Sequence, residues 1–132
     1  MALQTLYNAP TLTLSYDHAN DWLYLDWHGA LDDESVVAGA LKLLELLKQE
    51  QCSKVLNDNT RITGLWADAA KWGSDVFLPM LYEAGCRSFA WVYSPERYSQ
   101  LSAQLAMEQT AAGIAIMPFQ NRDTAAEWLQ RM

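Results

Sequence analysis

The two histidines, His18 and His28, are the side chains best suited to general acid–base catalysis near neutral pH. His18 falls within a predicted hairpin turn, where we expect it to be solvated. His28 ends a predicted strand just before Gly29, and from there it could face the carboxylate of Asp58. Two hypotheses for His28 follow: an acid–base partner of Asp58, or an ordinary structural hydrogen-bond donor.

The acidic run Asp32–Glu34 could bind a hard cation, because such ions take oxygen ligands. The run also stands directly before apolar residues at helical spacing, where negative charge stabilises the start of a helix. No glycine-bearing loop with the spacing of metal ligands surrounds it. We therefore predict that these carboxylates cap a helix rather than bind a metal.

Cys52 and Cys86 lack a Cys-x-x-Cys partner, so we predict two reduced thiols without a metal or redox role. The nucleotide-binding patterns Gly-x-Gly-x-x-Gly and Gly-x-x-x-x-Gly-Lys are absent from the sequence, as are the hydrolase patterns Gly-x-Ser-x-Gly and His-Glu-x-x-His. We therefore predict that the chain is not an enzyme and has no cofactor.

Hydrophobic periodicity predicts the elements that must position these side chains. The predicted strands are 11–16, 22–27, 54–58, 88–93 and 114–117. The predicted helices are one from 32–34 to about 48, two within 65–84 that separate at Gly73, one from 94 to about 112, and one that begins near 123. The order is β-β-α-β-α-β-α-β-α, which indicates a single α/β domain over 1–132. Its mixed, mostly parallel five-stranded sheet would carry an N-terminal antiparallel hairpin strand.

Residue types at the ends of these elements predict their boundaries. Ser74, Ser94 and Asp123 are the expected N-caps of the later helices, and glycines are expected to end two of them at Gly85 and Gly113. The side chains of 57–60 favour a turn directly after the third strand.

Ligands of parallel α/β sheets bind at the carboxyl ends of the strands. Two of these ends, with the segments that follow them, carry polar or aromatic side chains, and we take them as a candidate ligand or partner site. Its residues are Asp58, Asn59, Thr60, Arg61, Thr63, Trp66, Trp72, Tyr93 and Ser94.

The six tryptophans divide by position. Trp22 and Trp27 are five apart in one strand, so they face opposite sides of the sheet. Trp91 and Trp128 are expected to pack in the core. Trp66 and Trp72 fall in an interrupted helical segment, and for them both core packing and a contact with a ligand or partner remain open.

With these elements in place, the sequence resembles the SpoIIAA-like, or STAS-like, domain family, which includes the anti-sigma-factor antagonists. It is more closely similar to small bacterial SpoIIAA-like proteins of unassigned function. The residues that carry this resemblance are Trp66, Trp72, Pro79, Gly85, 89–92, Tyr98 and 125–129. The resemblance implies a SpoIIAA-like fold and a role in binding or regulating other proteins.

The antagonists of this family carry an Asp-Ser-x-Gly motif whose serine a partner kinase phosphorylates. The corresponding stretch 57–64 contains no serine, so the resemblance does not extend to this switch. Thr60, or Thr63 before Gly64, could place a hydroxyl near the same point. The start of the following helix is still expected to suit an anion, because its amides and dipole attract negative charge.

A formal net charge of −7 argues against nucleic acid and anionic membranes as partners. No secretory signal and no spanning segment is evident, so we expect a cytoplasmic protein without membrane insertion. The first hypothesis is a non-enzymatic regulator that binds a protein partner or forms a homodimer. The alternative is a carrier of a small lipophilic ligand. A docking surface would expose Trp66 and Trp72, whereas a carrier would turn them inward around a pocket.

Overall fold

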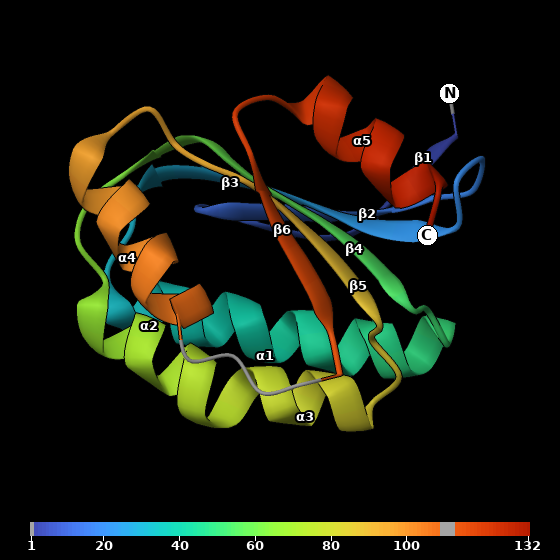
Figure 1. Cartoon of the computed structure of the whole chain (residues 1–132), viewed down its shortest axis with the longest axis horizontal. Coiled ribbons are helices and arrows are strands. Elements are labelled where there is room, and N and C mark those ends of the chain that lie inside the picture. Colours follow the sequence, from blue (N-terminus) through green and yellow to red (C-terminus); the bar gives the residue numbers. More distant parts are fainter. Residues whose placement is uncertain (1, 109–112) are drawn as a thin grey trace.

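The structure of the chain is a computed structural model that describes residues 2–108 and 113–132. Six strands form one sheet in the order in which they occur in the sequence, with helices on both sides (Figure 1). The strands are β1 (Leu3–Ala9), β2 (Leu12–Asp17), β3 (Trp22–Ala30), β4 (Lys54–Thr63), β5 (Ser88–Val92) and β6 (Ala115–Phe119). The helices are α1 (Asp33–Glu50), α2 (Ala67–Trp72), the π-helical η1 (Gly73–Phe77), α3 (Leu78–Glu83), α4 (Arg97–Glu108) and α5 (Arg122–Gln130). The mixed, mostly parallel α/β architecture is confirmed.

The crossover helices lie on one face of the sheet. β1, β2 and β3 pair antiparallel, whereas β3 to β6 pair parallel and step across the sheet in one direction. Connections between parallel strands are right-handed, so successive steps in one direction place their helices on the same side. α1, α2, α3 and α4 accordingly share one side, while α5, which follows the last strand, lies on the other (Figure 1).

The prediction of five strands is wrong, because β1 adds a sixth at the edge of the sheet. None of the side chains of β1 is buried, so no apolar alternation marks it in the sequence. A register shift between Thr5 and Tyr7 further interrupts its pairing with β2. An exposed edge strand of this kind carries too little periodicity to be recognised.

The predicted turn after Asp58 is also wrong, because β4 runs on to Thr63. Pairing with β5 ends at Asp58 and Val92, but pairing with β3 continues beyond a bulge. In this bulge the Asp58 carboxylate accepts the Thr60 N–H at 3.0 Å. The polar side chains therefore shape a bulge in the strand instead of ending it.

The start of α1 is as predicted. The Asp32 carboxylate accepts the Ser35 N–H at 2.8 Å, and the Ser35 hydroxyl oxygen accepts the Asp32 N–H at 3.1 Å. This reciprocal pair is a capping box, with Asp33 and Glu34 in the first helical turn. The acidic run thus caps α1 and places negative charge in its first turn.

The predicted N-cap at Ser74 is wrong, because no helix begins there. Gly73 keeps right-handed helical angles, so α2, η1 and α3 continue into one another. Ser74 lies inside η1, and its buried hydroxyl has no hydrogen-bond partner among the described residues. A wider π-helical turn has taken the place of the expected break.

Two further caps differ from prediction by a few residues. α4 is capped by Glu96, not Ser94: the Glu96 carboxylate accepts the Ser99 N–H at 2.7 Å. α5 is capped by Asn121 rather than Asp123, which sits in the first turn. The expected end of α4 near 112 lies outside the described residues.

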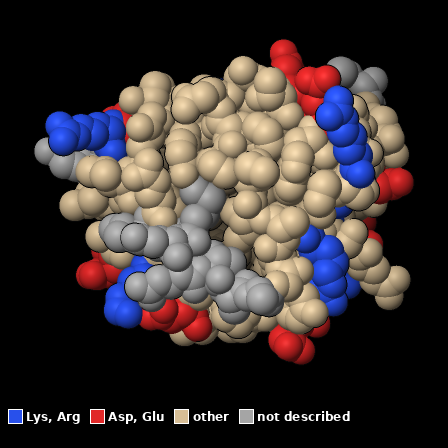
Figure 2. All heavy atoms as spheres, viewed as in Figure 1, with Lys and Arg blue, Asp and Glu red and all other residues tan. Residues whose placement is uncertain are grey.

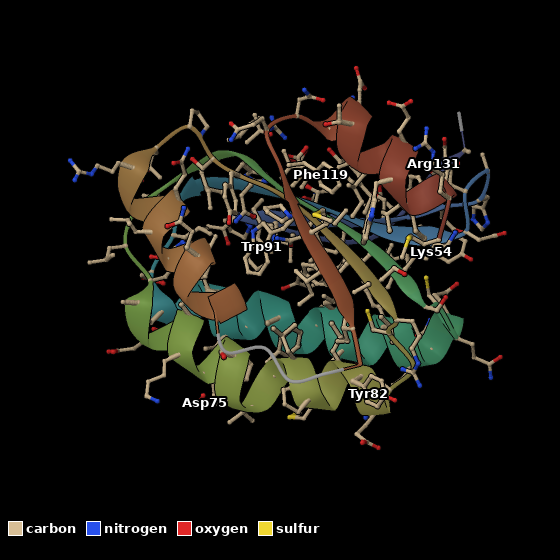
Figure 3. All side chains as sticks on the ribbon, in the orientation of Figure 1. Lys54, Asp75, Tyr82, Trp91, Phe119 and Arg131 are labelled. Atoms are coloured by element: carbon tan, nitrogen blue, oxygen red, sulfur yellow. The ribbon has the colours of Figure 1, made fainter. Side chains whose placement is uncertain are left out.

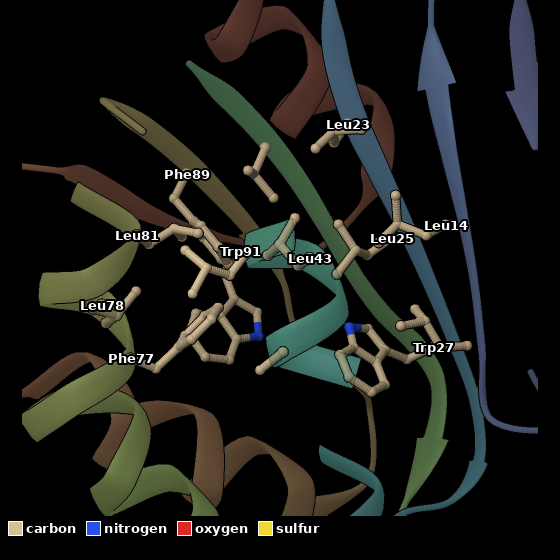
Figure 4. Packing of buried hydrophobic residues seen from close by; sticks show 14 of the residues in the cluster. Leu14, Leu23, Leu25, Trp27, Leu43, Phe77, Leu78, Leu81, Phe89 and Trp91 are labelled. Atoms are coloured by element: carbon tan, nitrogen blue, oxygen red, sulfur yellow. The ribbon is translucent and has the colours of Figure 1, made fainter. Parts of the chain in front are cut away.

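Two hydrophobic clusters fill the faces of the sheet. The larger contains Trp27 and Trp91 and packs under the crossover helices (Figure 4). The smaller contains Trp22, and the half-buried Trp128 of α5 packs against it. Figure 3 shows Trp91 and Phe119 on opposite sides of the sheet. The predicted separation of Trp22 and Trp27 and the packing roles of Trp91 and Trp128 are confirmed.

Gly39 allows α1 to approach β3. A Cβ built there would lie 2.3 Å from the Trp27 ring, whereas one at Gly73 would meet nothing within 4 Å. We expect Gly39→Ala to lower the free energy of unfolding by about 1–2 kcal/mol. The added methyl group overpacks the contact with Trp27, and this destabilises the fold more than the higher helix propensity of alanine stabilises it. Gly73→Ala, the matched control, should leave stability unchanged or raise it by up to about 1 kcal/mol. Urea denaturation measures both, and equal effects would contradict the close packing.

Candidate functional site

The residues predicted to form one site lie on two faces of the sheet. Side chains alternate along β4, so Asn57 and Asn59 face the crossover helices while Asp58 faces α5. Trp66 and Trp72 join the asparagines on the helix-covered side. The structure therefore contains a polar cluster on one face and a cavity on the other.

The polar cluster is centred on Asp58, which is only 6% exposed. Its carboxylate accepts the Tyr24 hydroxyl at 3.0 Å and, on the other oxygen, both the Thr60 N–H and the Thr60 hydroxyl. The Arg122 guanidinium donates to the Tyr24 oxygen at 3.1 Å. Arg61 forms an exposed ion pair with Asp26 beside this cluster. The contacts of Tyr24, Arg122 and Arg61 thus hold β3, β4 and α5 together.

Tyr24, Arg61 and Arg122 hold their protons more tightly than usual in this cluster. Burial, with the nearby carboxylates, raises the pKa of Tyr24 to about 12, although the hydrogen bond from Arg122 opposes the rise. The pKa of Arg61 is raised by its hydrogen bond to Asp26, and that of Arg122 by its hydrogen bond to Tyr24. In the described part of the chain no hydrogen bond joins His28 to Asp58. Proton transfer between these two side chains would need such a hydrogen bond or one bridging water.

The anion expected at the start of the helix after β4 is supplied by the chain itself. The Asp33 carboxylate, from the first turn of α1, accepts the Ala69 N–H at 2.9 Å. The Trp66 N–H donates to the Ser102 hydroxyl at 3.2 Å. Thr60 is bound to Asp58, and Thr63 is exposed at the end of β4. The predicted anion position is therefore filled by an internal contact between α1 and α2.

At the carboxyl end of β5, Ser94 is 1% exposed and serves the fold. Its hydroxyl donates to the Ile62 carbonyl at 2.7 Å and accepts the Glu96 N–H at 3.0 Å. Tyr93 is half-buried and packs against the larger core cluster. These two residues link β5 to β4 and to the start of α4, and they take no part in the polar cluster.

The cavity lies between the sheet and the segment from α1 to α3, and its volume is about 60 Å³. Trp66 is 4% exposed and stacks on Trp91, with ring centroids 6.3 Å apart and planes within 9°. Trp72 is half-buried and stacks on Phe77. The side chains that give the wall its aromatic and polar character are Trp27, Asn57, Asn59, Trp66, Trp72 and Trp91. Trp66 and Trp72 thus face inward.

A chain of hydrogen bonds borders this cavity. The Trp27 indole N–H donates to the Asn57 side-chain oxygen at 2.8 Å, and the Asn57 amide donates to the Asn59 oxygen at 3.2 Å. Asn57 and its contact with Trp27 were not predicted from the sequence. Two asparagines at i and i+2 in a buried strand were the available signal, because that spacing places both on one face.

Neither thiol is activated. Cys52 and Cys86 are free and buried. Burial raises the pKa of both, that of Cys86 to about 12, so both stay protonated at neutral pH. Within residues 2–108 and 113–132, no group of three or more His, Cys, Asp or Glu side chains could hold a metal ion.

Solved structures provide a fold comparison. The crystal structure of apo-SiaC from Pseudomonas aeruginosa matches with a TM-score of 0.52 and 18% identity, over 89% of this chain and 99% of that one. A second structure of SiaC from the same organism matches with a TM-score of 0.51 and 17% identity, over 90% and 100% of the two chains. No protein-family model and no curated protein matches the sequence. The chain therefore shares the SiaC fold, which is consistent with the SpoIIAA-like architecture expected from the sequence.

Tyr24→Phe should lower the free energy of unfolding by about 1–3 kcal/mol at pH 7, because the buried Asp58 loses a donor. The variant should also change how the free energy of unfolding falls at alkaline pH. The folded pKa of Tyr24 lies above its ordinary value of 10, so its contribution is complete below pH 10 and is lost as the pH rises toward 12. Phenylalanine cannot ionise, so the loss should be shallower in the variant.

Denaturation curves between pH 7 and 12 measure both effects. Tyr7→Phe, a substitution on β1 away from this cluster, is the matched control. Identical curves for Tyr24→Phe and Tyr7→Phe would rule out the coupling of Tyr24 to Asp58.

Proposed function

We propose that the chain acts by binding another protein rather than by catalysis. The observation that carries this proposal is the uncharged surface along β6, the last strand of the sheet. The sequence 113–121 contains no Lys, Arg, Asp or Glu. Ala115, Met117 and Pro118 are exposed, Met117 by 43%. Figure 2 shows that the described centre of this face is uncharged and that charged residues lie at its periphery.

The geometry of β6 favours docking through side chains. Ala115 donates its N–H to the Arg87 carbonyl, and the Phe119 carbonyl accepts the Tyr93 N–H. Alternate residues of a strand direct their backbone groups to the same neighbour, so those of Ile116 and Pro118 face the free edge. Pro118 has no N–H to offer there. A partner would therefore contact Met117 and its neighbours rather than add a strand to the sheet.

Other observations support a binding role. The aligned fold neighbours share the architecture, burial raises the pKa of both thiols, and the acidic charge disfavours nucleic acid. Trp66 and Trp72 are not part of the docking surface, since both face inward. No helix in the described ranges has the length and apolar character needed to cross a membrane. The chain also lacks the Asp-Ser-x-Gly motif, so we propose binding without that phosphorylation switch.

Met117→Glu should weaken partner binding by about tenfold or more, because it places a charge at the centre of the docking surface. Leu41→Glu is the matched control: Leu41 is 44% exposed, close to Met117, but lies on α1. Proteins retained by the immobilised wild type and by both variants can be quantified by mass spectrometry. A partner retained by wild type and Leu41→Glu but lost by Met117→Glu is the expected result.

Light scattering of the same three proteins tests the homodimer. A dimer that only Met117→Glu dissociates would identify a second copy as the partner. Equal retention by all three proteins, or neither a partner nor self-association with any of them, would overturn the proposed function.

The cavity favours a second candidate function, the carriage of a small ligand. Trp66 and Trp72 both line it, as a carrier requires. Its volume of about 60 Å³ is well below the roughly 150 Å³ of a cavity that holds benzene. A long-chain lipid does not fit this space, so the candidate is limited to ligands smaller than benzene.

The carrier function predicts that isobutene raises the melting temperature and changes tryptophan fluorescence, because binding to the folded state stabilises it. Dodecanoic acid should do neither. Ala69→Leu, which adds carbon atoms to the cavity wall, should abolish the response to isobutene, whereas Ala126→Leu on α5 should retain it. The absence of any response in the wild type would refute the carrier function.

A further inference from the structure

Two indole N–H groups at the cavity have no hydrogen-bond partner. Trp66 is 4% exposed and Trp91 is 6% exposed, and the nitrogen of each is fully shielded yet unpaired within the described chain. Both rings line the cavity. Figure 4 shows the nitrogen edge of Trp91 facing the Trp27 ring across the core. An unpaired buried donor costs about 1–3 kcal/mol, so two at one cavity call for an acceptor.

Trp27, another of the tryptophans that line the cavity, has an indole N–H with a hydrogen-bond partner. The Trp27 N–H donates to Asn57 at 2.8 Å, and Asn57 in turn donates to Asn59. The side-chain oxygens of both asparagines are thus already used as acceptors. Neither unpaired indole therefore has an acceptor among the described residues.

The wall of the cavity restricts the charge and the size of that acceptor. Its described side chains are apolar apart from the two asparagines and the indole nitrogens, and none is ionisable. A charged ligand would lose its hydration without a counter-charge, which is costly. At about 10–15 Å³ per water-sized position, a volume of about 60 Å³ holds about four to six such positions.

The lining residues that keep some solvent contact are Val36, Trp72 and Gly73. They place the approach to the cavity between the start of α1 and the junction of α2 with η1. η1 is a π-helical turn, a feature found frequently at functional sites. A ligand entering here would reach the indoles by passing Trp72.

We propose that this cavity binds a small uncharged molecule whose oxygen accepts hydrogen bonds from the indoles of Trp66 and Trp91. The ligand class is a compact carbonyl compound of about four or five non-hydrogen atoms, with an apolar remainder that contacts the aromatic wall. This inference rests on the carrier function proposed above and adds the chemistry of its ligand.

Acetone and isobutene form a matched pair of probes, because they have the same shape and differ in the oxygen. Titration of the full chain is followed by the indole N–H signals in nitrogen-15 NMR spectra. Acetone should move the signals of Trp66 and Trp91 downfield and leave that of Trp128 in place, whereas isobutene should not move them downfield. Trp66→Phe and Trp91→Phe should each weaken acetone binding by about two- to tenfold without weakening isobutene binding. Trp128→Phe is the matched control.

The outcomes separate the two proposals. If isobutene binds but acetone does not, or if the Phe variants weaken both probes equally, the carrier function stands and the acceptor inference fails. If neither probe binds, the cavity holds ordered water only and both fail. Should a Phe variant not fold, the downfield shifts in the wild-type protein decide the question alone.

Discussion

The right-handedness of the connections from β3 to β6 determines what each face of the sheet contains. Because each strand is added on the same side of the one before it, all three crossovers fall on one face. That face acquires a thick helical layer, a large core and, within it, a cavity. The opposite face is left to α5 alone, so part of the sheet around Met117 stays open. The buried cavity and the exposed surface thus follow from one topological constraint.

β4 connects the two faces through the alternation of its side chains. On the covered face Asn57 pairs with Trp27 and Asn59, while Asp58 on the other face anchors Tyr24 and, through it, α5. A polar sequence that would ordinarily end a strand is tolerated here because each side chain has a partner. The bulge after Asp58 then shifts the register of the remaining residues against β3.

Local patterns were sufficient where the deciding contacts are local. The period of two assigned Trp22 and Trp27 to opposite faces, and the acidic run before α1 located the cap at Asp32. The polar cluster joins Tyr24 to residues 34 and 98 positions away, and no local pattern reveals such contacts. β1 was missed because its side chains are not buried. Ser94 was misassigned because its hydroxyl reaches across to β4 rather than to its own helix.

A sheet with an apolar, uncharged edge strand is a template on which identical chains can stack into fibrils. β6 would be such a template if every outward amide were available. Pro118 removes one of these amides and places a rigid ring there. Because its backbone faces away from β5, the hydrogen bonds between β5 and β6 are kept. The chain can therefore expose an apolar surface along β6 and still resist edge-to-edge pairing with further copies of itself.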